Sequence, residues 1–150
     1  MASYRFNRFA NDIARVNVNL TADALYIALV TSLPSTSVST RADLVNEVAG
    51  GSYVRKDLVK TTGTNPTVYL SNSSSLRFGN TVWTALWAAT AAPIIGGVIF
   101  KGTVAASAVG DIALGFVELI PAYTPPTSPS PAPSTFTFVW NTAGAIFLGQ

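Results

Sequence analysis

Residues 43–59 of this chain read DLVNEVAGGSYVRKDLV. They separate a polar N-terminal part of the chain from an apolar C-terminal part. Residues 41–60 hold seven of the 16 charged side chains (nine basic and seven acidic), while the segments that follow are long and almost free of charge. Gly50 and Gly51 lie at the boundary. Because glycine adopts positive φ without steric cost, the pair predicts a tight turn that leads into a strand over residues 52–60.

The composition is that of a single globular domain, residues 1–150, with a surface poor in charge. The chain is 49% hydrophobic, which is enough for a core, and only 11% charged, about half the usual share. Its net charge of +2 is small and the basic residues are scattered, so no specific nucleic-acid partner is expected. Uncharged polar groups or other protein chains must therefore cover the surface.

Several classes of chemistry are excluded by what the sequence lacks. There is no cysteine and no histidine, which removes the common zinc sites and the Ser-His-Asp triads. No phosphate-binding or dinucleotide-binding glycine motif occurs. The seven carboxylates are spread along the chain, and although a distant pair could still form a glycosidase site, we expect no enzyme, no cofactor and no metal.

A membrane span is not expected either. Residues 78–100 carry no charge, but Asn80, Pro93 and the Gly96–Gly97 pair interrupt them, and two tryptophans lie inside the stretch rather than at its ends. The N-terminus has no apolar core of a secretory signal. Two buried strands joined by a turn are the better interpretation of residues 78–100.

Periodicity predicts one short amphipathic helix over residues 3–16. Asp12 lies within reach of Arg8 and Arg15 on its surface. The helix either packs on its own domain or docks on a neighbouring subunit. Its apolar face would consist of Phe6, Phe9, Ile13 and Val16.

Most of the remaining chain predicts β-strands. The continuous apolar run at 24–30 suits a strand buried on both faces, and residues 42–48 are expected to form one or two helical turns. Together with the end of the chain, this gives a mainly β fold of seven or eight strands, a β-sandwich or jelly roll. The further strands are expected at 52–60, 67–71, 76–78, 82–90, 97–104 and 112–120.

The C-terminal part has two special features. Residues 121–133 contain six prolines, which predict a stiff surface loop over about 121–134 rather than a strand. Residues 135–140 and 145–148 alternate in polarity around a short link with Asn141 and Gly144, which predicts a β-hairpin over 135–148.

Protein contact is the function that these features favour. The last 32 residues after Glu118 carry no charged side chain, as is typical of the centres of interfaces. A solvated strand face or an ordinary core hairpin is the alternative for the same residues. The interface candidates are Phe6, Arg8, Phe9, Tyr53, Arg55, Lys56, Tyr123, Pro125 and Pro126, and the structural turn candidates are Gly50, Gly51, Asn141 and Gly144.

Four segments, in this order, resemble small virion structural proteins of tailed bacteriophages. They are FNRFANDI at 6–13, LYIALVTSLP at 25–34, NEVAGGSYVRK at 46–56 and the aromatic C-terminal hairpin. The most specific part is the Asn-Glu-Val-x-Gly-Gly-x-Tyr-x-Arg block. The long proline loop departs from the compact members of this group.

The resemblance implies a head decoration, or cement, protein that binds the outer capsid lattice and stabilises it. Its partners would be the major capsid protein and copies of itself, often as a trimer, and its location the virion. A tail, neck or fibre component is one alternative. A carbohydrate-binding sandwich that stacks sugars on Trp83, Trp87 and Trp140 is another, and a hydrolase is more distant. We also expect that deletion of residues 1–16, or replacement of residues 122–133 by a short Gly/Ser link, weakens attachment to the particle more than it unfolds the domain.

Overall fold

The computed structural model describes residues 3–20, 22–59, 75–76, 78–89, 91–128, 135–140 and 146–147. Within these ranges the chain is mainly β, as predicted, with antiparallel sheets and one short α-helix. The elements are β1 (Ser3–Arg5), α1 (Phe9–Ala14), β2 (Leu25–Val30), η1 (Arg41–Asp43), β3 (Lys56–Asp57), β4 (Ser75–Leu76), β5 (Thr81–Trp83), β6 (Ile94–Lys101), η2 (Val104–Ala106), β7 (Ala113–Tyr123), β8 (Phe136–Phe138) and β9 (Ile146–Phe147), where η marks a 3-10 helix.

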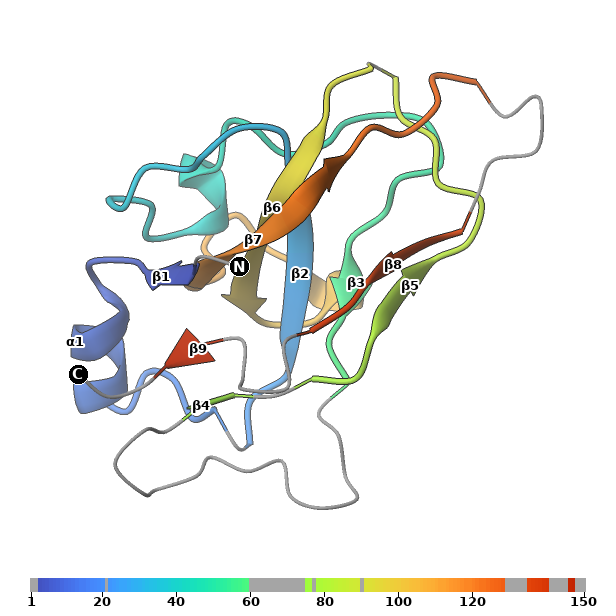
Figure 1. Ribbon diagram of the computed structural model, residues 1–150. Helices are drawn as coiled ribbons and strands as arrows, with labels where there is room; N and C mark the ends of the chain where they lie inside the picture. The colour runs from blue at the N-terminus through green and yellow to red at the C-terminus, as the bar shows by residue number, and fades with distance from the viewer. Residues whose placement is uncertain are drawn as a thin grey trace.

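A five-stranded antiparallel sheet forms the centre of the fold (Figure 1). Its strand order is β1-β7-β6-β2-β3, so β1 and β3 are its edges. Two further pairs, β4 with β9 and β5 with β8, are separate two-stranded sheets. Figure 1 shows β5 and β8 running side by side.

The central sheet buries apolar side chains on both faces. All six residues of β2 are buried, which confirms the strand predicted from the run at 24–30. Leu25, Ile27 and Leu29 belong to one core cluster, whereas the residues between them belong to the other. The first cluster also includes Trp83 and Phe138 of the β5–β8 pair.

The N-terminal prediction is wrong in part. Residues 3–5 form β1, which pairs with the edge of β7, and only residues 9–14 form the helix. Phe6 and Phe9 are each 2% exposed, but Phe6 precedes the helix and belongs to a different core cluster from Phe9, and Val16 is 79% exposed beyond the helix end, so the predicted single apolar face does not form. The strand forms because the N–H and C=O groups of residues 3–5 pair with β7. The spacing of apolar side chains carries no information about such a distant hydrogen-bond partner, so periodicity did not predict it.

Two predicted strands are much shorter than expected. Between residues 52 and 60, only Lys56–Asp57 form β3. Of residues 82–90, strand geometry ends at Trp83, because a turn follows in which Ala85 has φ of 55°. Beyond this turn Leu86 and Ala88 are buried while Val82 is exposed, so they do not share a face as predicted. The strand predicted at 67–71 and residue 60 lie outside the described residues.

The predicted C-terminal hairpin is wrong. β8 pairs with β5 and β9 pairs with β4, so the two segments have different, distant partners instead of each other. A turn signal between two segments does not choose their partners when more distant strands offer better packing. Asn141 and Gly144 lie outside the described residues.

The proline-rich stretch is only partly a loop. β7 continues through Pro121 to Tyr123, across an irregularity in its ladder with β6, where a proline is tolerated. Pro125 is buried, and the carbonyl oxygen of Pro126 accepts the N–H of Ala88 at 3.0 Å. Residues 129–134 lie outside the described residues.

Candidate functional site

The block with Gly50 and Gly51 is a loop with both ends fixed on β2. Upstream of the glycines, the N–H of Val48 donates to the carbonyl of Leu29 at 2.9 Å. Downstream, β3 pairs with β2, and the N–H of Leu58 donates to the carbonyl of Leu25 at 2.8 Å. Residues 49–55 therefore leave the sheet edge and return to it.

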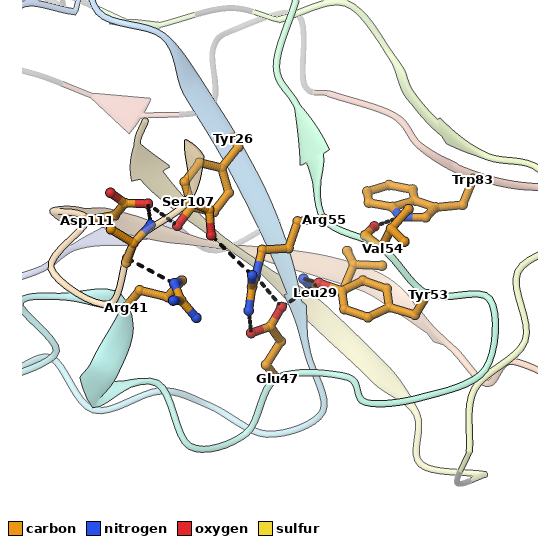
Figure 2. A network of polar contacts seen from close by, with 11 residues as sticks. Tyr26, Leu29, Arg41, Glu47, Tyr53, Val54, Arg55, Trp83, Ser107 and Asp111 are labelled. Carbon is orange, nitrogen blue, oxygen red and sulfur yellow. Dashed lines mark hydrogen bonds and ion pairs between the residues drawn. The ribbon is translucent and has the colours of Figure 1, made fainter. Parts of the chain in front are cut away.

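The side chains of three residues bind one another where this loop leaves and rejoins the sheet (Figure 2). They are Glu47, Tyr53 and Arg55, and we call them the edge clamp. The guanidinium of Arg55 donates to both carboxylate oxygens of Glu47, at 2.7 and 2.8 Å. The Tyr53 hydroxyl donates to Glu47 at 3.0 Å and accepts the N–H of Leu29 at 2.9 Å. The tyrosine thereby fills the gap in the ladder where the loop leaves β2.

The surroundings of Tyr53 and Arg55 in the edge clamp raise the pKa values of both side chains. Burial, followed by the negative charge of Glu47, raises the pKa of Tyr53 above its usual value. Hydrogen bonds to Glu47 raise the pKa of Arg55. Tyr53 therefore remains a neutral donor and Arg55 a cation at physiological pH, which suits a structural contact and not a proton-transfer site.

A second group of polar side chains adjoins the edge clamp. Ser107 accepts a hydrogen bond from Arg55 at 3.2 Å. Nearby, the Tyr26 hydroxyl donates to Asp111 at 2.9 Å, and burial and Asp111 together raise the pKa of this tyrosine. Asp111 also accepts the N–H of Ala108 at 2.9 Å, so the loop after η2 is fixed to the sheet by these contacts.

The two glycines bring the loop into contact with residues 85–89. Gly50 and Gly51 have φ of 72° and 69°, in agreement with the predicted turn. A Cβ on Gly51 would overlap the carbonyl group of Trp87, and the N–H of Ser52 donates to that carbonyl oxygen at 3.0 Å. The indole N–H of Trp83 donates to the carbonyl of Val54 at 2.7 Å. Both positions thus require glycine for φ and for close packing.

An open pocket of about 960 Å³ lies beside the edge clamp. Its lining holds two acidic and two basic side chains; Glu47 pairs with Arg55, and the carboxylate of Asp57 accepts the N–H of Val104 at 2.7 Å. Lys56 has no ion-pair partner among the described residues. The lining consists of Glu47, Val48, Ala49, Tyr53, Val54, Arg55, Lys56, Asp57, Val104 and Ala105.

Two of the predicted interface residues near the N-terminus are inside the molecule. The side chains of Phe6 and Phe9 are core residues, so the prediction that they contact a partner is wrong for the folded chain. Arg8 is exposed, and its guanidinium lies 3.4 Å from the buried carboxylate of Asp12.

The predicted residues around the edge clamp and in the proline-rich stretch are also largely used within the chain. Tyr53 and Arg55 bind Glu47, and Tyr123 stacks on Phe136 with ring centroids 4.6 Å apart. The side chain of Pro125 is buried. Lys56 and Pro126 remain accessible, half-buried and exposed respectively.

Sequence reasoning missed the roles of Glu47 and Ser107. The signal for Glu47 was present, because two residues that flank a Gly-Gly turn with opposite charges can meet when the chain reverses there. Nothing local indicated Ser107, which is 52 residues from Arg55. In the part of the chain that the structure describes, no three carboxylates, histidines or cysteines gather at one point, and no helix is long and apolar enough to cross a membrane.

Comparisons with protein-family models, curated proteins and solved structures found no match to this chain. The likeness to virion proteins therefore rests on the four sequence segments quoted above.

Proposed function

We propose that this chain is a structural protein of a tailed-bacteriophage virion, a decoration protein that binds the outer capsid lattice and stabilises it. Its partners are the major capsid protein and further copies of the chain. This assignment rests on the resemblance of the 46–56 block and its neighbours, together with the character of the described surface.

The observation that carries the proposal is an exposed surface rich in aliphatic side chains and poor in charge. Eight aliphatic residues of the described chain are more than half exposed, and only 16 of 150 residues are charged. Single exposed valines are ordinary, but so many on a surface with so few charges suit burial against other subunits. The eight are Val16, Leu33, Val45, Val54, Val59, Val109, Ile120 and Val139.

The edge clamp supports the same proposal. Its charged groups bind one another within the chain, and Tyr53 binds the backbone of β2. The block at 46–56, which is the most specific part of the resemblance, therefore holds the sheet edge in one conformation. A rigid edge is useful to a protein that binds a lattice, because less conformational entropy is lost on attachment. Each copy would stabilise only the assembled capsid, and many weak copies would act together.

A reconstitution experiment tests this proposal. Heads and tails of the phage that encodes the chain are prepared without it, incubated separately with the purified protein, and sedimented. We expect the chain to sediment with heads and to raise the temperature at which they release DNA. Failure to bind heads would overturn the decoration role, and binding to neither heads nor tails would overturn the virion assignment as a whole.

The first alternative, a tail, neck or fibre component, is favoured by binding to tails alone in the same experiment. The carbohydrate-binding alternative needs Trp83, Trp87 and Trp140 to stack sugars, and of these only Trp87 is partly exposed, since the indoles of Trp83 and Trp140 are 2% and 6% exposed. Their N–H groups donate to Val54 and Thr81 inside the fold. Neither ring presents a face on which a sugar could stack.

We also propose that the complete fold is a β-sandwich. This proposal is supported by the core cluster that Trp83, Phe136 and Phe138 of the β5–β8 pair share with apolar residues of β2. In this arrangement the β5–β8 pair forms the second layer, and β4 and β9 extend it.

A further inference from the structure

The end of α1 has an unusual residue at its capping position. The N–H of Asn17 donates to the carbonyl of Asp12 at 2.9 Å, and the N–H of Val16 donates to that of Ile13 at 3.0 Å. These two bonds are those of a Schellman motif, in which the residue after the C-cap adopts positive φ and is usually glycine. Here it is Val16, with φ of 60°.

Valine is poorly suited to this conformation. A β-branched residue with positive φ is a steric outlier, because its Cβ and γ-methyl groups crowd the adjoining backbone. Such strain persists where the side chain is needed for something else. Val16 is 79% exposed, so the folded chain gains little from burying it.

The surroundings of Val16 combine apolar and cationic groups. Ile13, one turn earlier, is 36% exposed, and Arg15 directly before it is exposed. Arg8 is exposed as well but forms an ion pair with the buried carboxylate of Asp12 at 3.4 Å, so Arg15 is the cation of this end of α1 that has no ion-pair partner among the described residues. Nearby, the ammonium group of Lys101 and the carboxylate of Asp23 form an ion pair at 3.0 Å, so these two charges neutralise each other.

We propose that Ile13, Arg15 and Val16, which we call the α1 tip, are the contact by which the chain docks on an acidic surface of the capsid protein. Val16 enters an apolar depression there, and Arg15 faces the carboxylates around it. This inference rests on the proposed function. It explains why an exposed valine occupies a position at which glycine would relieve strain, and it moves the predicted N-terminal contact from Phe6 and Phe9 to residues that are accessible.

Replacement of Val16 separates stability from binding. Val16→Gly should raise the melting temperature of the free chain by about 2–4 °C because it relieves the positive φ. Asparagine also tolerates this φ, and it does not add the conformational freedom that glycine gives to the unfolded chain. Val16→Asn should therefore not lower the melting temperature. Both should weaken binding of the purified chain to decoration-free heads about tenfold, measured by co-sedimentation over a range of protein concentrations.

Ala85→Gly is the matched control, because Ala85 is exposed and has φ of 55° in a turn that is distant in sequence from α1. It should leave binding unchanged. Arg15→Glu should weaken binding at low salt and much less at about 0.5 M salt, since screening removes the charge contribution.

The outcomes separate this inference from the proposed function. Failure of the wild-type chain to bind heads overturns both. Normal binding by the wild type and by both Val16 variants overturns the role of the α1 tip alone. A fall in melting temperature with both Val16 variants would also overturn it, because the valine would then serve the fold.

Discussion

Gly51 is the residue at which backbone conformation and packing are most tightly linked. Its φ of 69° disfavours any side chain, and a Cβ would overlap the backbone of Trp87 and Ala88. We expect Gly51→Ala to lower the free energy of unfolding by at least about 2 kcal/mol, measured by urea denaturation. The control is Gly110→Ala, whose added Cβ meets no atom within 4 Å and should cost less than about 0.5 kcal/mol. Equal effects of the two substitutions would contradict this account of the turn.

Asp43 predicts a pH dependence of stability. Its carboxylate accepts hydrogen bonds from the backbone and hydroxyl groups of Thr40 and Ser39, and these lower its pKa from 3.8 to about 2. Because the pKa is lower in the folded state, the stabilisation is complete above the unfolded value and is lost as the pH falls through about 2.

The measurement compares the wild type with Asp43→Asn. The difference in melting temperature between them should be constant from pH 7 down to about pH 5 and should shrink between pH 4 and about 2. A difference that stays constant through this range would show that the carboxylate charge is not the stabilising feature.

At the scale of elements, the pairing of β8 with β5 is the feature that differs most from expectation. Val82 lies directly opposite Thr137 in this pair. The chain has no cysteine, so Val82→Cys with Thr137→Cys should form one intramolecular disulfide under mild oxidation, because directly opposed residues in antiparallel strands are within bridging distance. Thiol titration and mass spectrometry would detect it. Two free thiols after oxidation of the folded protein would contradict the pairing, and the single variants control for cross-linking between molecules.

The elements also show which features a sequence can predict. The residue types of β2 are apolar throughout, and local composition alone identified a strand buried on both faces. The partners of β8 and β9 depend on segments about 55 to 70 residues away, which no turn signal reveals. The same holds for β1, which exists because β7 offers an edge. In the site, the turn glycines were predictable, whereas the contact of Arg55 with Ser107 was not.

The structure changes the expected result of one deletion. Loss of residues 1–16 removes the edge strand β1 and the buried rings of Phe6 and Phe9. Removal of one buried aromatic side chain typically costs about 3–5 kcal/mol, so this deletion should unfold the domain and not only detach it. Single substitutions at the α1 tip are the appropriate way to test the proposed N-terminal contact.

At the scale of the whole molecule, the charge-poor aliphatic surface and the internally satisfied edge clamp suit a subunit that acts through contacts with many copies of its partner. Quantitative mass spectrometry of purified particles measures this most directly, as copies of the chain per copy of the major capsid protein. We predict on the order of hundreds of copies per particle, as expected for a protein that repeats over the capsid lattice. A ring-like count of about six or twelve would contradict the decoration role in favour of a tail or connector, and absence from the particle would contradict the virion assignment itself.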